Sequence, residues 1–555
     1  MSQPQRNVTG QFSHKFDTVS WLGMVVMLSF IQGGCTLDRQ LRSNPAGETV
    51  WQAAIKGNPE AEFELGLMYD EGRGVDRNEV KAVRWCRRAA EHGNAKAQIK
   101  LGWAYEKGIG ITKNFGLAVE WYQRAADKGD PTAQAYLAWL FMEGRGLLKD
   151  DAKAAELYRR AAEQGYLDAQ ANVGVMYLDG IGVAKDAAKG AEWLRRAADQ
   201  GHSVAMFSLG VMYQDGKGVQ QDDITAAAWY RRAAEKGEPH AQNNLGMLYQ
   251  TGRGVDRNLV EAAEWFRRAA EQSYATAETN LGLMYDEGNG VERDFAKAAE
   301  WYGRAAKQGD GAALYNLGLM FEDGRGLERN YLRAVEYYRL AAERGHSDAF
   351  LNLGAMYFNG LGVNRDETKA LQWFQRAADM GNARAQANLG MLYMLGQGVV
   401  ADDKKAVEWF RRAAEQGQSL GQYYLGRMFD EGRGVIRDDV EAVAWYQRAS
   451  EQGEPGSQNR LGSMYRDGRG VDKDEVRAVN WYRLAAEQGY SDAQVNLGLM
   501  YEEGLGVLKD EMEAISWYCR AAEQGDSDGQ METILMSILH PLQPVNYCFA
   551  SVPLL

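Results

Sequence analysis

The chain has 555 residues, of which 45% are hydrophobic and 25% charged, and its formal net charge at pH 7 is −13. This acidic excess argues against a nucleic-acid partner, because phosphate binding depends on Lys and Arg. The four cysteines and six histidines are scattered, without the spacing of a metal site or a catalytic group, so neither a metal nor another cofactor is expected.

The first 35 residues are typical of an export signal or a membrane anchor. Residues 18–37 carry no charge, and their strongly apolar part is about a dozen residues long, which fits the hydrophobic region of a secretory signal better than a membrane span. Gln32-Gly33-Gly34-Cys35 follows at once and resembles a bacterial lipobox, which implies a lipidated Cys35, although Gln32 replaces the usual apolar residue. An uncleaved N-terminal anchor and an ordinary secretory signal are the alternatives.

Residues 36–58 are interpreted as a polar linker followed by half of a structural unit. The segment around Ala53 and Gly57 lies 36 residues before a similar segment around Ala89 and Gly93. We therefore expect a half-repeat that caps the N-terminal end of an array.

Residues 59–525 consist of thirteen copies of a 36-residue repeat. The pair Leu65-Gly66 marks the register, and equivalent pairs recur without an insertion as far as Leu497-Gly498. A fixed period of this length outweighs every other sequence signal and predicts an array of stacked units.

Each repeat is predicted to contain two helices, helix A and helix B. In the first repeat, Ala61, Leu65 and Met68 have the spacing of an apolar stripe on helix A. Ala82 and Trp85 begin a second stripe on helix B. No single pair of helices can bury such stripes alone, so the repeats are expected to stack on one another.

The ends of both helices are marked in the sequence. Gly72 and Gly74 are predicted to end helix A, because glycine adopts backbone angles that other residues resist. Asn78 is the predicted N-cap of helix B, and every copy has Asn or Asp there. Gly93 is the predicted left-handed end of helix B, with Ser273 as the exception among thirteen copies.

A glycine inside helix A predicts close packing. Gly66 costs about 1 kcal/mol relative to alanine, so its recurrence suggests that helix B passes close by at Ala82 and Ala89. The large side chain of Trp85 is expected to fill the gap between stacked hairpins.

The pattern A-x-x-x-L-G-x-M-Y-x-x-G-x-G-V-x-x-D, followed by A-x-x-W-x-x-R-A-A-E-x-G, resembles the Sel-1-like repeat (SLR), a relative of the tetratricopeptide repeat. The resemblance covers residues 59–525 and implies an all-α fold. That fold is an α/α solenoid (superhelix) of thirteen helix-turn-helix repeats with terminal capping helices, and helix A lines its concave face. Residues 526–555 are expected to form a C-terminal capping helix and a tail.

Residues shared by all copies encode the fold, so partner-binding residues are expected where the copies differ. Positions 60, 64, 67 and 71 share one stripe of helix A, and the resemblance directs that stripe into the groove. The candidates on it are Lys100, Trp103, Tyr136, Trp139, Asn244, Asn280, Asn316, Asn352, Asn388, Arg427 and Arg460.

These candidates fall into three groups. The two tryptophans, with Lys100 and Tyr136, suggest an aromatic binding patch, the alternative being burial between repeats. The asparagines suggest a ladder of amides along an extended peptide, unless each is satisfied within its own hairpin. Arg427 and Arg460 are expected to grip an acidic group, unless they are simply solvated.

We therefore expect a non-enzymatic scaffold or adaptor of the bacterial cell envelope that binds other proteins or peptides in its groove. It would face the periplasm and reach the membrane through its N-terminus. If Cys35 is lipidated, Thr36 in the next position resembles the sorting pattern of an outer-membrane lipoprotein. Inner-membrane anchoring and secretion are the alternatives. The rival functions are a cell-wall or β-lactam hydrolase, an activity of SLR proteins with paired cysteines that this chain lacks, and a secreted effector that binds a host protein.

Overall fold

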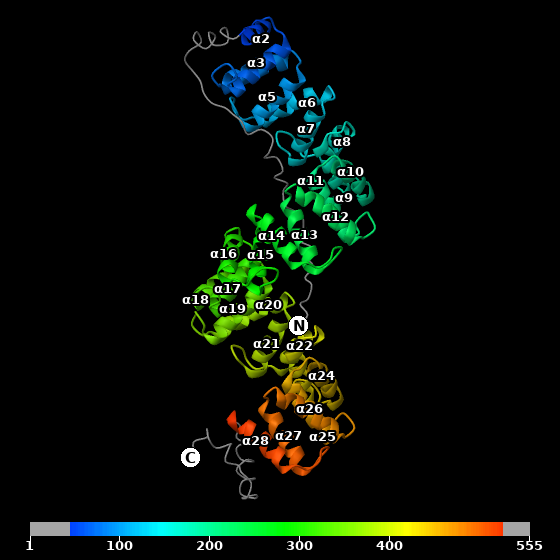
Figure 1. Ribbon diagram of the computed structural model, residues 1–555, viewed down its shortest axis with the longest axis vertical. Coiled ribbons are helices and arrows are strands. Elements are labelled where there is room, and N and C mark those ends of the chain that lie inside the picture. The colour runs from blue at the N-terminus through cyan, green and yellow to red at the C-terminus, as the bar shows by residue number, and fades with distance from the viewer. Residues whose placement is uncertain (1–44, 526–555) are drawn as a thin grey trace. The chain divides into compact units, whose positions relative to one another are not determined.

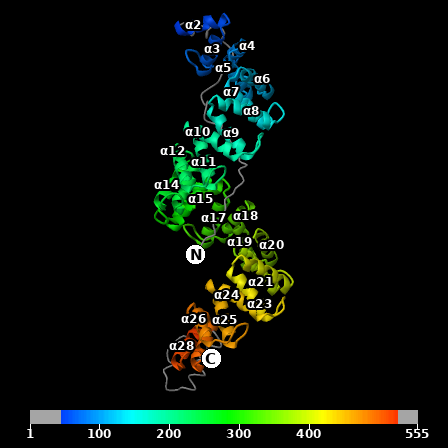
Figure 2. The same ribbon diagram turned by 90° about the vertical axis from the view of Figure 1, so that its right-hand side faces the viewer.

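The computed structural model describes residues 45–525. The predicted signal and lipidation site at Cys35, and the predicted cap and tail at 526–555, lie outside the described residues. The described part contains 27 helices, and the chain divides into two compact units between Ala269 and Ala270. Within each unit, consecutive helices pack against one another in chain order (Figures 1 and 2).

Unit 1 begins with a single helix and continues with helix pairs; repeat 1 is the pair α3 and α4. Its helices are α2 (Pro45–Ile55), α3 (Pro59–Glu71), α4 (Glu79–Glu91), α5 (Ala95–Lys107), α6 (Phe115–Asp127), α7 (Pro131–Glu143), α8 (Asp151–Glu163), α9 (Leu167–Asp179), α10 (Ala187–Asp199), α11 (Ser203–Asp215), α12 (Asp223–Glu235), α13 (Pro239–Thr251) and the first part of α14 (Leu259–Glu271).

Unit 2 contains repeats 7 to 13, and repeat 13 is the pair α27 and α28. Its helices are α15 (Ala275–Glu287), α16 (Phe295–Lys307), α17 (Gly311–Asp323), α18 (Tyr331–Glu343), α19 (Ser347–Asn359), α20 (Glu367–Asp379), α21 (Ala383–Leu395), α22 (Asp403–Glu415), α23 (Ser419–Glu431), α24 (Asp439–Glu451), α25 (Pro455–Asp467), α26 (Glu475–Glu487), α27 (Ser491–Glu503) and α28 (Glu511–Glu523). The predicted all-α solenoid of thirteen repeats is confirmed.

The helix ends lie where the sequence predicts them. The side chain of Asn78 accepts a hydrogen bond from the backbone N–H of Lys81 at 2.9 Å, and the Asn or Asp at this position caps helix B in all thirteen repeats. Gly72 ends α3 with φ 73°, and Gly93 follows α4 with φ 93°. Ser273 occupies the latter position with φ 62°, the only positive φ outside glycine in the described residues.

The predicted close approach of the two helices within a hairpin is confirmed, and the residue after the tryptophan occupies it, while the tryptophan itself packs between hairpins as predicted. A Cβ atom on Gly102 would lie 2.8 Å from the ring of Tyr122, the residue after the tryptophan. Tyr122 is fully buried, and other repeats have Tyr or Phe in its place, apart from Cys86 and Leu194. Trp121 is buried in the same core, together with Val83 of the preceding repeat, and the guanidinium of Arg124 lies 4.4 Å from its ring centroid.

The second glycine of each turn joins one repeat to the preceding one. A Cβ on Gly434 would lie 2.4 Å from the backbone oxygen of Asp403, which begins α22 in the preceding repeat. The turn therefore rests directly on the backbone of the preceding helix B, and only glycine leaves room for this contact.

A buried glutamine on helix A also crosses the boundary between repeats. Nε2 of Gln386 donates to the carbonyl oxygen of Ala378 in the preceding repeat at 3.1 Å, and Nε2 of Gln416 donates to Oε1 of Gln386 at 2.7 Å. Both bonds recur at Gln134, Gln170, Gln422, Gln458 and Gln494. We call this arrangement the glutamine bridge; it adds a second hydrogen bond to a carbonyl at the end of helix B that already accepts one from the backbone N–H of Gly381.

Candidate functional site

One stripe of every helix A remains accessible to solvent. In α3, Leu65 and Met68 are buried, whereas Glu60 and Glu71 are exposed and Leu67 is half-buried. We call the outward positions of helix A, equivalent to 60, 64, 67 and 71, the helix A face. All eleven predicted partner-binding residues lie on it, and each is half-buried except Arg460, which is exposed.

The predicted aromatic patch of unit 1 is held in place by its neighbours. Lys100 pairs with Asp70 at 2.6 Å, and its Nζ lies 5.1 Å from the ring centroid of Trp103. The guanidinium of Arg145 lies 4.8 Å from the ring of Trp139. Both indole rings contact the core with one part and remain partly accessible with the other, so a partner would meet preorganised aromatic surface.

Tyr136 belongs to the same patch, and its ring packs against the buried core. Its ring stacks on Tyr122 with centroids 5.2 Å apart and planes 19° apart. Burial and the negative charge of Glu106 raise the pKa of its hydroxyl. The phenol is therefore neutral at physiological pH and can donate a hydrogen bond to a partner.

Three asparagines of the predicted ladder contact the buried tyrosine of the preceding repeat. Burial raises the pKa of Tyr230, and a hydrogen bond from Asn244 in the following repeat opposes that rise. Asn352 has the same relation to Tyr338. Asn316 has it to Tyr302, and Asn280 and Asn388 are half-buried at the equivalent positions. Contacts with the preceding repeat, and not within one hairpin, thus explain three of these amides, and peptide binding by the row stays a prediction.

The two predicted arginines lie on α23 and α25, in adjacent repeats of unit 2, and their surroundings differ. Arg427 pairs with Glu431 on its own helix at 2.8 Å, and its side chain is 26% exposed. Arg460 is exposed and has no ion pair among residues 45–525. Only the second is available as a full charge to a partner.

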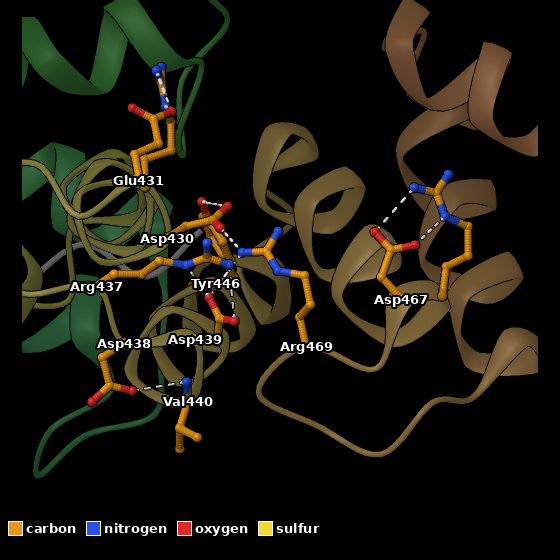
Figure 3. Close-up of polar contacts among 11 residues, drawn as sticks. Asp430, Glu431, Arg437, Asp438, Asp439, Val440, Tyr446, Asp467 and Arg469 are labelled. Atoms are coloured by element: carbon orange, nitrogen blue, oxygen red, sulfur yellow. Dashed lines mark hydrogen bonds and ion pairs between the residues drawn. The ribbon is translucent and has the colours of Figure 1, made fainter.

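A charged cluster between repeats 11 and 12 was not predicted. Arg469, in a turn, contacts Asp430 and lies 2.9 Å from Asp439, which Arg437 also contacts at 3.1 Å (Figure 3). Hydrogen bonds from both arginines hold the pKa of Asp439 below its usual range. The only signal in the sequence is an arginine between two turn glycines, and it does not reveal which carboxylates lie opposite.

The described part of the chain contains no group of three or more His, Cys, Asp or Glu that is arranged to hold a metal ion. Between residues 45 and 525, no helix combines the length and the apolar character that crossing a membrane requires.

Comparisons with known proteins agree with this architecture. The Sel1 repeat model matches thirteen consecutive segments, from residues 59–94 to residues 491–526. Among solved structures, a protein of uropathogenic Escherichia coli, described as a protective antigen with an SLR fold, is 33% identical, with a TM-score of 0.63 over 84% of this chain and 96% of that one. A Sel1 repeat protein from Oxalobacter formigenes is 31% identical, with a TM-score of 0.41 over 44% of this chain and 96% of that one. No curated protein is similar enough to count as a match.

Proposed function

This chain belongs to the Sel1 repeat family and is a protein-interaction scaffold, and we propose that it serves the bacterial cell envelope without enzymatic activity and binds partner proteins along its helix A face. The observation that carries the proposal is the contrast between two sets of positions. Those that pack the hairpin are nearly invariant between repeats, whereas the outward positions change from charged to aromatic to amide along the array.

The composition of this face suits protein recognition. Trp103, Trp139 and Arg427 are of the residue types that contribute most to the energy of protein interfaces. Each already has a cation–π or ion-pair partner in the free chain. Because their positions are fixed in advance, binding costs little side-chain entropy.

Two observations support a location in the envelope. The apolar stretch before Cys35 is typical of an export signal or anchor. The 33%-identical Escherichia coli protein is described as a protective antigen, a description that agrees with exposure outside the cytoplasm. Lipidation of Cys35 belongs to this proposal, and fractionation followed by mass spectrometry of the N-terminal peptide tests it.

Affinity capture with the full chain after cross-linking in bacteria tests the proposal. A face variant changes four accessible residues of helix A, and a control variant makes matched changes on the exposed side of helix B. The face variant carries Trp103→Ala, Trp139→Ala, Arg427→Glu and Arg460→Glu; the control carries Leu340→Ala, Leu484→Ala, Arg84→Glu and Arg339→Glu.

We expect the native chain and the control to capture the same envelope proteins, and the face variant to lose them while retaining its helical circular dichroism. Loss with the control alone would move the site to helix B. Failure of the native chain to enrich any envelope protein would reject the proposed function.

A further inference from the structure

Arg460 stands in open surroundings on the helix A face of repeat 12. The residues one turn before and after it on this face are Gly456 and Ser463, both small. On helix A of the preceding repeat, Tyr424 is equivalent to Arg460 and Arg427 is equivalent to Ser463. The exposed guanidinium is therefore bordered by small residues on its own helix and by larger ones on the preceding repeat.

The carboxylates of these two helices already have partners. Glu431 pairs with Arg427 at 2.8 Å and with Arg433 at 3.7 Å. Asp467 pairs with Arg466 at 2.8 Å. Glu454, just before α25, accepts a hydrogen bond from the backbone N–H of Gly456 at 3.1 Å. The positive charge of Arg460 is left to a group from outside the hairpins.

An aromatic wall borders this charge. The rings of Tyr423 and Tyr424 lie 5.0 Å apart at 60°, and Tyr424 is fixed by stacking on Phe410 at 5.1 Å and 16°. A Cβ atom on Gly456 would lie 3.1 Å from the ring of Tyr423, so the two repeats are in close contact here. Arg460 is also near enough to oppose the rise in the pKa of Tyr490, which burial raises to about 12.

We propose that the helix A face of repeats 11 and 12 binds an extended acidic peptide segment of a partner protein, with a carboxylate on Arg460 and an aromatic or apolar side chain against Tyr424. The proposal rests on the proposed function and names the chemistry of the partner. Neighbouring helices lie about 10 Å apart, the span of roughly three extended residues. The recognised segment therefore has its carboxylate about three residues from its aromatic side chain.

A dense polyanion fits this surface poorly. Nucleic acids and acidic polysaccharides need a row of cations that neutralises successive charges. Here Arg427 is paired with Glu431 and Arg466 with Asp467, so Arg460 is the only arginine of α23 and α25 without an ion pair among the described residues. A single well-placed carboxylate is the better match.

Fluorescence anisotropy with the full chain tests the proposal. The probe is a labelled peptide of glycine and serine with one phenylalanine and, three residues later, one glutamate; a second probe has glutamine instead of the glutamate. We expect the first probe to bind and the second to bind about tenfold more weakly or worse, because hydrogen bonds to charged groups are the strong ones. Increasing salt weakens the first interaction, since the arginine is exposed.

The variants separate charge from fold. Arg460→Met is expected to weaken binding of the glutamate probe about tenfold without changing the melting temperature, whereas Arg460→Lys retains part of the affinity. Lys404→Met removes an exposed charge from the same unit, away from the helix A face, and is expected to leave binding unchanged.

Equal affinity for the glutamate and glutamine probes, or unchanged binding by Arg460→Met, overturns the proposal. A galacturonic acid oligomer that competes more strongly than the glutamate peptide overturns the choice of occupant. If the native chain captures envelope partners but does not bind the glutamate probe, this inference fails and the proposed function stands. If it captures none, the proposed function fails as well.

Discussion

At the scale of single residues, the exit from helix B depends on one backbone angle. Glycine adopts the left-handed conformation at this position in the other repeats, as Gly345 does with φ 80°. Ser273 adopts it with φ 62°, where an L-residue costs about 1–2 kcal/mol. Ser273 is therefore a strained position in an otherwise regular array.

Ser273→Gly is expected to stabilise unit 2 by about 1 kcal/mol, because removing the Cβ releases this strain. The reverse change at an equivalent position, Gly345→Ser, is expected to destabilise by a similar amount, since no atom within 4 Å obstructs the new side chain. Urea unfolding monitored by circular dichroism measures both. A Ser273→Gly variant no more stable than the native chain would show that the strain is relieved elsewhere.

The buried tyrosines of helix B predict a loss of stability at alkaline pH. Burial raises the pKa of Tyr158 above its ordinary value, so the unfolded chain loses this proton at lower pH than the folded chain. The stabilisation is complete below about pH 10 and is lost as the pH rises above it. Tyr166, with a pKa raised to about 12 mainly by burial, acts in the same direction.

We expect the melting temperature to fall from pH 10 upward, with tyrosinate absorbance at 295 nm appearing together with unfolding. Tyr158→Phe introduces the ring that Phe266 supplies in another repeat, and the variant should gain stability relative to the native chain over this pH range. Parallel pH profiles for the two proteins would contradict the argument.

At the scale of helices and turns, two glycines that both have positive φ are required for different reasons. Gly434 has φ 69°, and its missing Cβ leaves room for the backbone of Asp403. Gly417 has φ 82° but no atom within 4 Å of the Cβ it lacks. One glycine is required by packing between repeats, and the other only by its backbone conformation.

Gly417→Ala is expected to cost about 1–2 kcal/mol from backbone strain alone. Gly434→Ala adds an overpacking cost of about 1–3 kcal/mol, because the new methyl group collides with backbone atoms that cannot rotate away. Chemical denaturation of the two variants measures the difference. Equal destabilisation would mean that the turn moves away from α22 at no cost.

The sequence predicted most of what lies within one hairpin. The apolar spacing of Leu65 and Met68, the cap at Asn78 and the glycine at 93 depend on residues a few positions apart, and all are confirmed. The position on the helix A face of the candidate binding residues followed from the same spacing.

Contacts between repeats were harder to predict, because the residues that they join belong to different hairpins. The bond from Gln386 to Ala378 and the pairing of Arg469 with Asp430 depend on which faces meet across a boundary. A helical period alone does not specify those faces. It also does not show whether an arginine on a surface has an acidic neighbour, which is what distinguishes Arg427 from Arg460.

At the scale of the whole chain, stability in a repeat array is a sum of repeats and their boundaries. Deleting residues 347–382 removes α19 and α20 and brings two equivalent boundaries together. Deleting only residues 365–382 removes α20 and leaves α19 followed by another helix A. The first deletion preserves every type of contact, whereas the second does not.

We expect the 347–382 deletion to retain the helical circular dichroism per residue and cooperative unfolding, with only a modest decrease in unfolding enthalpy. The 365–382 deletion is expected to lose more helix than the residues removed, because two apolar stripes are left uncovered. Calorimetry and circular dichroism distinguish the two. Collapse of the in-register deletion would show that the repeats are not interchangeable.

The contact of the second turn glycine with the preceding helix B has a genetic consequence. Since Gly434 meets Asp403 as Gly470 meets Asp439, recombination between the coding segments of two repeats adds or removes whole repeats and restores the same contact at the new junction. Array length can therefore change over evolutionary time without an intermediate gene product that fails to fold. Each such event also adds or removes one complete row of outward-facing residues, so the set of recognised partners can change in single heritable steps.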